Sequence, residues 1–356
     1  MRPTEKTFTK SREMVFPRSI LVGHEALPRV VDMSRNLGFT GPGLMITGEN
    51  TYKSAGRDVE DFMSDGGYDM TVCFSGNATF ENVDKAVKLG EEAGCRFILA
   101  VGGGNKIDTA KLAAKNLGVH FISIPTSASH DGIASGRASL RSSTETMSVE
   151  AVSPMGILAD TGVITAAPYR YLISGCADVI SNISALADWK LSKKNHNEFF
   201  SSSAYQMSMM AAETIIDISK SIKPDDEECT WLVLKPIILS GVSMSVAGSS
   251  RPTSGSEHMF SHALDALHPG KAMHGEQCGV GSIMMTYLQG KDWMRIRGAL
   301  KDIGAPVDAA GLGLEPEDII DALTHMHKVR SDRVTIIGSG LSKAAAEEVA
   351  RATGVI

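Results

Sequence analysis

Residues 97–117 read FILAVGGGNKIDTAKLAAKNL, and this stretch decides the fold. The apolar run FILAV predicts a buried strand, three glycines follow it, and a helical period runs from about Lys106 to Leu117. A second apolar run, VHFISI at 119–124, comes directly afterwards. A strand, a glycine turn, a helix and another strand in succession predict parallel strands covered by helices.

The same alternation extends toward the N-terminus. Short apolar runs at 19–23, 43–47 and 70–74 predict strands, and residues 25–38 and 81–94 have helical periods. After about Pro168 only helical periods remain. We therefore predict an α/β fold in which a Rossmann-like, mostly parallel sheet domain (1–165) precedes an all-helical domain (166–356). The active site is expected in the cleft between the two domains.

The composition limits the function. The chain has 356 residues, 43% of them hydrophobic, and a net charge of −6, which argues against disorder and against a nucleic-acid partner. No apolar run reaches the ~18 residues of a membrane span, and the N-terminal segment does not resemble a secretory signal. The five cysteines are widely spaced without a CxxC pair, which favours a reducing cytoplasm, and we expect Cys176 and Cys278 to be buried.

The glycines at 102–104 stand at a strand-to-helix turn. Gly102, Gly103 and Gly104 let the backbone approach a phosphate closely, and the helix that starts near Asn105 supplies free N–H groups. The pattern is neither GxGxxG nor a P-loop, and a tight turn that needs glycine for geometry alone remains an alternative. Asp108 and Lys111 follow on the helix, where a solvated face or a local cap would also explain them.

The next strand is followed by IPTSASHDGIASG, residues 124–136. Its hydroxyl side chains, Thr126, Ser127, Ser129 and Ser135, lie at the carboxyl end of a strand, which is where open α/β sheets bind ligands. An ordinary serine-rich loop is the alternative. Asp131 is expected to project into the same cleft.

Residues 257–276, EHMFSHALDALHPGKAMHGE, hold four of the chain's ten histidines. The first part predicts a helix that ends at Pro269. His258 and His262 are four residues apart and share a helix face, whereas His268 points elsewhere and is expected at the surface. The loop after the helix can bring His274 back to His258.

Two histidines do not complete a catalytic zinc site, which usually has three protein ligands and an open position. Asp178 in GCADVI is the best candidate for the third ligand. Each residue also has a simpler interpretation: an acid near a helix start is favoured by the helix dipole, and a single helical histidine is usually structural.

Together these segments resemble the dehydroquinate synthase-like superfamily, which includes glycerol dehydrogenases and iron-containing alcohol dehydrogenases. The matching elements are GGGNKIDTAK, PTSASHDG, GCADVI and HMFSHALD…HGE, and they cover nearly the whole chain. Within the superfamily, the chain is most similar to the archaeal-type glycerol-1-phosphate dehydrogenases.

The resemblance implies one Zn²⁺ per subunit, held by Asp178, His258 and His274. It assigns NAD(H) or NADP(H) to a set of loop residues: Gly102, Gly103, Gly104, Asn105, Lys106, Asp108, Thr126, Ser127, Ala128, Ser129 and Ser135. Asp131, Asp178 and His262 are implied to be catalytic and to face the substrate.

Two further positions bear on the substrate and the cofactor. Arg251 lies seven residues before His258, where dehydroquinate synthases carry a phosphate-binding arginine, and a surface arginine is the alternative. Gly48 stands where related glycerol dehydrogenases have an aspartate that binds the adenosine ribose. Without that carboxylate, NADP(H) is expected to be accepted beside NAD(H).

The resemblance thus implies reversible, zinc-assisted reduction of dihydroxyacetone phosphate to sn-glycerol 1-phosphate for archaeal membrane glycerophospholipids. The implied enzyme is cytoplasmic and homo-oligomeric, with a small phosphorylated substrate. The alternatives are a glycerol or alcohol dehydrogenase of the same fold and a non-catalytic scaffold that binds metal or nucleotide. A dehydroquinate synthase is disfavoured, because Asp178 and Ser181 replace the glutamate and lysine of those enzymes.

Overall fold

The predicted parallel sheet is confirmed in the computed structural model, which describes residues 13–141, 146–330 and 333–356. The N-terminal segment 1–12, on which the expectation about a secretory signal depends, lies outside the described residues. Six strands pair in parallel in the order β1-β8-β5-β4-β2-β3. The strands are β1 (Ser19–Gly23), β2 (Gly43–Thr47), β3 (Met70–Phe74), β4 (Phe97–Gly102), β5 (His120–Pro125) and β8 (Gly156–Asp160).

Both faces of the sheet are buried, and β4 illustrates why. Successive side chains of a strand point to opposite faces. Ile98 and Ala100 join one hydrophobic cluster with Ile107, whereas Leu99 and Val101 join another. A strand with two buried faces is therefore apolar throughout, which is how FILAV reads.

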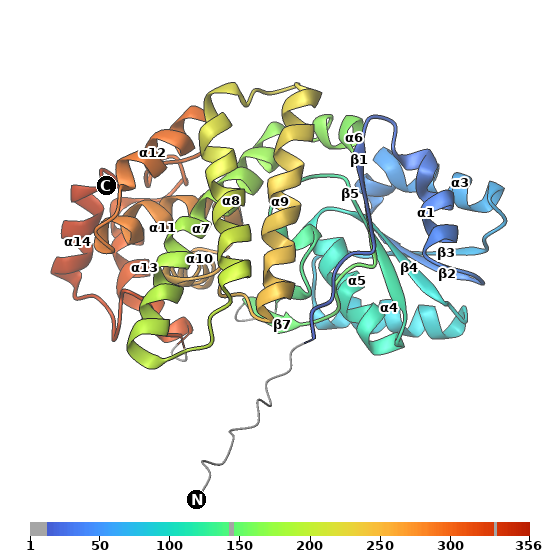
Figure 1. Cartoon of the computed structure of the whole chain (residues 1–356), viewed down its shortest axis with the longest axis horizontal. Helices are drawn as coiled ribbons and strands as arrows, with labels where there is room; N and C mark the ends of the chain where they lie inside the picture. Colours follow the sequence, from blue (N-terminus) through green and yellow to red (C-terminus); the bar gives the residue numbers. More distant parts are fainter. Residues whose placement is uncertain (1–12, 142–145, 331–332) are drawn as a thin grey trace, which may run out of the picture.

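Helices cover the two faces of the sheet (Figure 1). They are α1 (Val30–Asn36), α3 (Arg57–Asp65), α4 (Phe80–Glu92), α5 (Gly104–Leu117) and α6 (Thr161–Thr165), with a 3-10 turn at Leu27–Arg29. A short helix, α2 (Glu49–Thr51), and a π-helical turn (Tyr52–Gly56) lead directly into α3. The sequence analysis did not predict this helical run after β2.

A second, two-stranded sheet was also not predicted. The antiparallel strands β6 (Arg137–Arg141) and β7 (Thr146–Glu150) follow the serine-rich loop and a 3-10 turn at Asp131–Ile133. β7 contacts α10 (Ser256–Leu267) of the helical part. The two strands, which we call the β6–β7 hairpin, therefore connect the sheet to the helices that follow.

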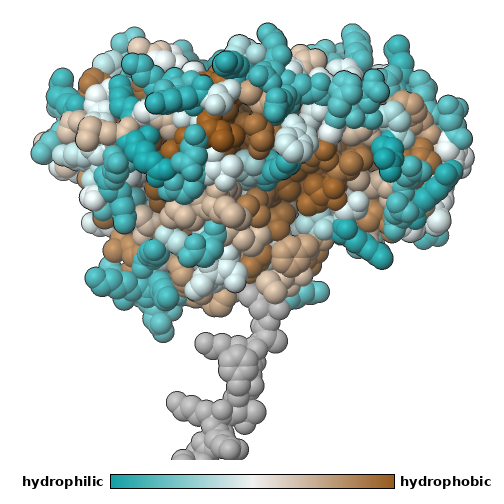
Figure 2. All heavy atoms as spheres, turned by 45° about the horizontal axis from the view of Figure 1, so that its top comes forward, coloured by the Kyte–Doolittle hydropathy of each residue, from teal (hydrophilic) through white to brown (hydrophobic). Residues whose placement is uncertain are grey.

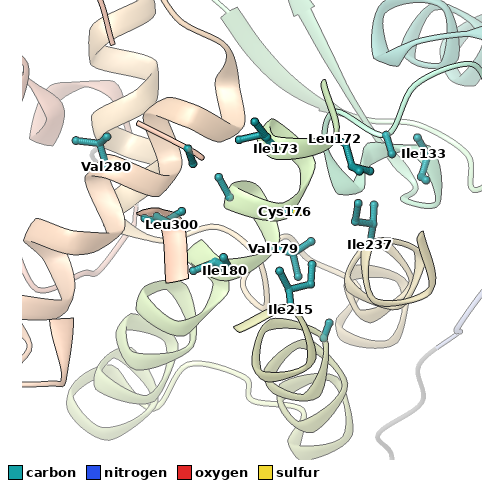
Figure 3. Close-up of a cluster of buried hydrophobic side chains, with 14 of the residues drawn as sticks. Ile133, Leu172, Ile173, Cys176, Val179, Ile180, Ile215, Ile237, Val280 and Leu300 are labelled. Carbon is teal, nitrogen blue, oxygen red and sulfur yellow. The ribbon is translucent and has the colours of Figure 1, made fainter. Parts of the chain in front are cut away.

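The second part of the chain is helical, as predicted. Its elements are α7 (Tyr169–His196), α8 (Ser202–Ile218), a 3-10 turn (Ser219–Ser221), α9 (Glu227–Ala247), α10 (Ser256–Leu267), α11 (His274–Leu288), α12 (Trp293–Asp302), α13 (Pro316–Val329) and α14 (Lys343–Ala352). Apolar side chains of α7 point toward their neighbours in Figure 3: Cys176, Val179 and Ile180 meet side chains of α8, α9, α11 and α12. The division at residues 165 and 166 stays a prediction.

Helix α9 is long and apolar enough, by length and composition alone, to cross a membrane, although the sequence analysis expected no span. Its most apolar stretch has a mean hydropathy of 1.5 and is 72% buried inside the fold. That burial is typical of a core helix. Exposed hydrophobic side chains include Phe16 and Ile20 outside this helix and Trp231 on α9 itself, and Figure 2 shows hydrophobic patches between hydrophilic residues on the face it draws.

Candidate active site

A cavity of about 1170 Å³ lies between the carboxyl ends of the parallel strands and the helical part. Its wall includes Gly48 after β2, Gly103 after β4 and Thr126 after β5, and it continues to His258 and His274 of the helical part. It brings together most of the predicted site residues: Gly103, Gly104, Asn105, Lys106, Asp108, Thr126, Ser127, Ser129, Asp131, Ser135, His258, His262 and His274.

Four of the predicted site residues are not among the described residues that line the cavity. Gly102 is the last residue of β4, and Ala128 is buried. The Ala128 carbonyl packs so closely on Gly175 of α7 that a Cβ there would lie 1.9 Å from its oxygen. Gly175 thus lets the serine-rich loop approach α7. The other two, Asp178 and Arg251, are described below.

Asp178 stands on α7, one turn after this close contact. Its Oδ2 accepts a hydrogen bond of 3.0 Å from the backbone N–H of Asp131. Its Oδ1 is buried and has no hydrogen-bond partner among the described residues. A buried polar atom without a partner costs free energy, so Oδ1 is arranged for a ligand.

The first of the two histidines near Asp178 is held by a carboxylate. His258 of α10 has its Nε2 3.7 Å from Asp178 Oδ1, and its Nδ1 lies 2.9 Å from Glu257 Oε1. The fully buried Glu257 also accepts hydrogen bonds from the Ser184 hydroxyl and the Gly255 N–H. Because a carboxylate accepts, the His258 Nδ1 donates, and Nε2 keeps its lone pair toward Asp178.

His274 is oriented in the same way by a hydrogen-bonded chain. The Ser261 hydroxyl donates to Gln277 Oε1 at 2.6 Å, so its oxygen is available to accept from His274 Nδ1 at 3.1 Å. Gln277 in turn donates to Asp265 Oδ1. This leaves the Nε2 of His274 facing Asp178 Oδ1 at 3.8 Å. The structure also shows His274 as the first residue of α11 rather than in a loop.

These three side chains fit a zinc ion. In a tetrahedral zinc site the ligand atoms lie about 3.3 Å apart, so separations of 3.7 and 3.8 Å need little adjustment. One carboxylate and two neutral imidazoles also suit zinc chemically. Cys278, one turn after His274, belongs to the same group, whose potential ligand atoms all lie within 4.8 Å of one another. The assignment of the ligands stays a prediction.

Burial determines the charges in this part of the cavity. It lowers the pKa of His258 and of His262 well below the usual histidine value, so both rings are neutral near pH 7. Burial also raises the pKa values of Asp131 and Asp178, and the closeness of the two carboxylates adds to the rise for Asp131. These pKa shifts therefore favour the neutral forms of the two histidines and of the two carboxyl groups until a cation binds.

Asp131 and His262 lie on either side of this trio. Ser240 donates a hydrogen bond of 2.8 Å to Asp131 Oδ2. The ring of His262 is 6.5 Å from that of His258 and 6.1 Å from that of His274, between ring centres. Its buried Nδ1 has no hydrogen-bond partner among the described residues. His268, expected at the surface, lies instead partly buried beside Asp318, at 3.3 Å.

At the other end of the cavity lies the N-terminus of α5. Asn105 Oδ1 accepts from the Ala78 N–H, and the Lys106 ammonium donates to the Gly76 carbonyl. The Lys106 side chain passes over Gly48, where a Cβ would lie 2.7 Å from its Cε. Gly48 thus leaves room for a positive charge at the end of β2.

Asp108 and Lys111 are not on a solvated face, because both are buried. The Lys111 ammonium donates to Asp108 Oδ1 at 2.8 Å and to the Arg137 carbonyl at 2.6 Å, and Asp108 Oδ2 accepts from the Ser139 N–H. Both oxygens of Asp108 are thus engaged by the protein. The ion pair fastens the β6–β7 hairpin to α5, and because Asp108 also lines the cavity, its contact with the cofactor stays a prediction.

Arg251 requires a correction, because the structure does not bring it to the cavity wall. Its guanidinium is buried and forms two hydrogen bonds with the Glu198 carboxylate, at 2.7 Å from Nε and 2.5 Å from Nη2. It also donates to the Val334 carbonyl and the Ser192 hydroxyl. Arg251 joins three chain segments, and the spacing to His258 that suggested a phosphate site does not by itself orient the side chain.

The sequence analysis also missed the groups that hold the site residues in place. Glu257 precedes a proposed ligand directly and Gln277 follows another by three residues, so their proximity was a usable signal. Arg330 lies in the cavity wall more than fifty residues after His274. Nothing local in the sequence marks it.

Comparison with known proteins agrees with this geometry. Residues 21–168 match the family described as iron-containing alcohol dehydrogenase. Over 343 residues the chain is 50% identical to the glycerol-1-phosphate dehydrogenase, NAD(P)+, of Methanosarcina mazei, covering 96% of each chain. It is 48% identical to the enzyme of the same name from Methanothermobacter thermautotrophicus, covering 97% of this chain and 99% of the relative.

Solved structures share the fold at low sequence identity. A glycerol dehydrogenase from Schizosaccharomyces pombe superposes with a TM-score of 0.80 at 19% identity, covering 97% of this chain and 91% of the other. A sulfoacetaldehyde reductase from Bifidobacterium kashiwanohense in complex with NAD+ gives 0.76 at 18%, covering 97% and 99%. The predicted fold class is thereby confirmed.

Proposed function

The chain belongs to the glycerol-1-phosphate dehydrogenase family, related to the iron-containing alcohol dehydrogenases, and from that premise we propose that it reversibly reduces dihydroxyacetone phosphate to sn-glycerol 1-phosphate with NADH or NADPH. One observation carries the proposal: the loops expected to bind the cofactor and the trio of Asp178, His258 and His274 line or adjoin one cavity. A non-catalytic scaffold would not need its cofactor loops and its metal ligands to meet at one cavity.

Asp178, His258 and His274 would hold the metal ion. The unpartnered Oδ1 of Asp178 and the two inward Nε2 atoms support this set. When bound, zinc supplies Lewis-acid polarisation of the substrate carbonyl, and the nicotinamide supplies the hydride. Cys278 would lie behind His274, with its sulfur 3.7 Å from that ring's Nε2.

The protein's own part is to bind, orient and protonate. Asp131 and His262 line the cavity next to the trio, and we assign both to the substrate's oxygen atoms. His262 is neutral near pH 7 and has a buried Nδ1 without a partner among the described residues, so it can donate its ring proton to the developing alkoxide only while its other nitrogen takes up a replacement proton from solvent in the cavity. Burial of these groups strengthens each hydrogen bond they make.

The cofactor would lie along the carboxyl ends of the strands. The N-terminus of α5 offers backbone N–H groups to its diphosphate, with hydroxyls of the loop after β5 beside it. Lys106 over Gly48 provides positive charge where the adenosine ribose is expected, which suits a 2′-phosphate. NADPH would therefore be accepted beside NADH.

The test is oxidation of NADH or NADPH by dihydroxyacetone phosphate, before and after removal of metal. Turnover with zinc-loaded protein and its loss on chelation are expected. Absence of turnover with fully metallated protein would refute the proposal. Oxidation of glycerol in preference to sn-glycerol 1-phosphate would instead identify an enzyme for a non-phosphorylated substrate.

Location, assembly and pathway are also proposals. All five cysteines are free and buried, which supports a reducing cytoplasm. The exposed hydrophobic side chains support a homo-oligomer, and light scattering of the purified protein would measure its mass. The product would supply the glycerol unit of archaeal membrane glycerophospholipids.

A further inference from the structure

A phosphorylated substrate needs positive charge near the trio, and Arg251 does not supply it. The described cations in the cavity wall are Lys106, Arg137, Arg141 and Arg330, besides the histidines. Lys106 bonds to Gly76, and the backbone of Arg141 bonds to Ala78, both on the segment that follows β3. Arg137 of β6 and Arg330 at the end of α13 line the same cavity as the histidines.

Hydrogen bonds hold both the backbone and the guanidinium of Arg137. Its carbonyl accepts a hydrogen bond from the buried Lys111 ammonium, which ties β6 to α5. Its guanidinium donates to the Ser148 hydroxyl from Nε at 3.0 Å and to the Ser148 carbonyl from Nη2 at 2.9 Å. These bonds hold the guanidinium plane, and the β7 strand that supplies Ser148 lies against α10. Arg137 is therefore held in the wall of the cavity that His258 of α10 also lines.

Arg330 reaches the same region from the helical part. It is the residue at the C-terminal end of α13, a helix that packs on α10. Burial lowers the pKa of Arg137, and the charge of Arg330 lowers it further. Arg330 and Arg137 line the same cavity as His258 and His262.

A doubly negative ligand in the cavity is attracted by each guanidinium that lines it. Guanidinium groups suit phosphate because they donate paired N–H groups in one plane. We propose that Arg137 of the β6–β7 hairpin and Arg330 of the helical part together bind the phosphate group of the substrate. This assignment rests on the proposed function and adds to it the residues that select a phosphorylated triose.

The test measures binding and turnover separately. Dihydroxyacetone phosphate is titrated calorimetrically into zinc-loaded protein saturated with NAD+, a combination that cannot react because the cofactor is already oxidised. Steady-state reduction of dihydroxyacetone phosphate is measured in parallel with NADH. The variants are Arg137→Gln and Arg330→Gln, with Arg330→Lys to keep the charge without the paired geometry. Arg351→Gln, an exposed arginine of α14 bound to Glu347, is the matched control.

We expect each glutamine variant to weaken dihydroxyacetone phosphate binding roughly 10- to 100-fold, with a matching rise in KM. The KM for NADH and the zinc content should stay unchanged, and Arg330→Lys should retain part of the binding. Inorganic phosphate should inhibit the wild type competitively and the variants much less. The Arg351→Gln control should behave as the wild type.

Three results would overturn the assignment. Unchanged binding in both glutamine variants would show that the phosphate lies elsewhere. A rise in the KM for NADH without a change for the substrate would assign the arginines to the cofactor. A loss of kcat alone, with binding intact, would leave them a structural role. Failure of the wild type to reduce dihydroxyacetone phosphate is a separate outcome that refutes the proposed function itself, and the phosphate site with it.

Discussion

Replacing Glu257 by glutamine tests whether the carboxylate beside His258 prepares the metal site. The amide has the same shape and can still accept from the Gly255 N–H and pair with the Ser184 hydroxyl. Only the negative charge next to the His258 Nδ1 is lost. The variant therefore separates the effect of the Glu257 charge on the metal site from folding of α10.

The size of the effect follows from the contact. Partners that orient a ligand histidine typically contribute about 10- to 100-fold in metal affinity, which is about 1.4 to 2.7 kcal/mol. Glu257 has no exposed area, so solvent does not screen its hydrogen bond to His258. We expect the zinc dissociation constant of Glu257→Gln to rise by this factor.

The measurement is a zinc titration of metal-free protein against a chromophoric chelator, together with a thermal melt of the same metal-free sample. Glu347→Gln, on the exposed face of α14, controls for the loss of one charge. A zinc dissociation constant within twofold of the wild type would refute the orienting role of Glu257. If the metal-free variant and the metal-free wild type have the same melting temperature, a folding defect is excluded as the cause of weaker binding.

Three further predictions concern Arg251, Gly48 and His258. Arg251→Gln should destabilise the protein by about 2–3 kcal/mol, because it breaks a mostly buried pair with Glu198, and should leave the KM for dihydroxyacetone phosphate unchanged; a tenfold rise in that KM would return Arg251 to the phosphate. Gly48→Asp should lower kcat/KM for NADPH relative to NADH about tenfold, since its carboxylate would displace Lys106 and repel a 2′-phosphate; an unchanged ratio would contradict the placement of the ribose. Free zinc at 100 times its dissociation constant should stabilise the wild type by about 2.7 kcal/mol in a thermal melt and His258→Ala hardly at all; equal stabilisation of both would exclude His258 as a ligand.

The sheet and the long helices could be predicted because each depends on a local pattern. FILAV is apolar at every position since β4 is buried on both faces, and the helices after Pro168 keep a regular apolar face. His258 and His262 were placed on one helix face by their spacing alone. Asp178 was chosen as an acid near a helix start, and the resemblance to a known family then supported it, because no local period connects this distant residue to the histidines.

The remaining features depend on contacts between distant segments. The β6–β7 hairpin is held by Asp108 and Lys111, which lie about thirty residues earlier, and a sequence period contains no record of such pairing. Arg251 was misplaced for a similar reason: its spacing from His258 is real, but Glu198, fifty-three residues upstream, decides where the guanidinium points. The direction of a side chain is set by the group to which it bonds and not by its spacing in the sequence.

Helix α5 sets the spacing between the proposed cofactor site and the β6–β7 hairpin. Its first turn, at Gly104, faces the proposed cofactor site, and Lys111 holds the hairpin that carries Arg137. Seven residues of α-helix separate the two points by about 10 Å along a rigid axis. On the proposed assignments, one element thus sets the distance between the cofactor's diphosphate and Arg137, so a substrate whose phosphate lies one carbon farther from the carbonyl would miss Arg137 even though its charge is the same.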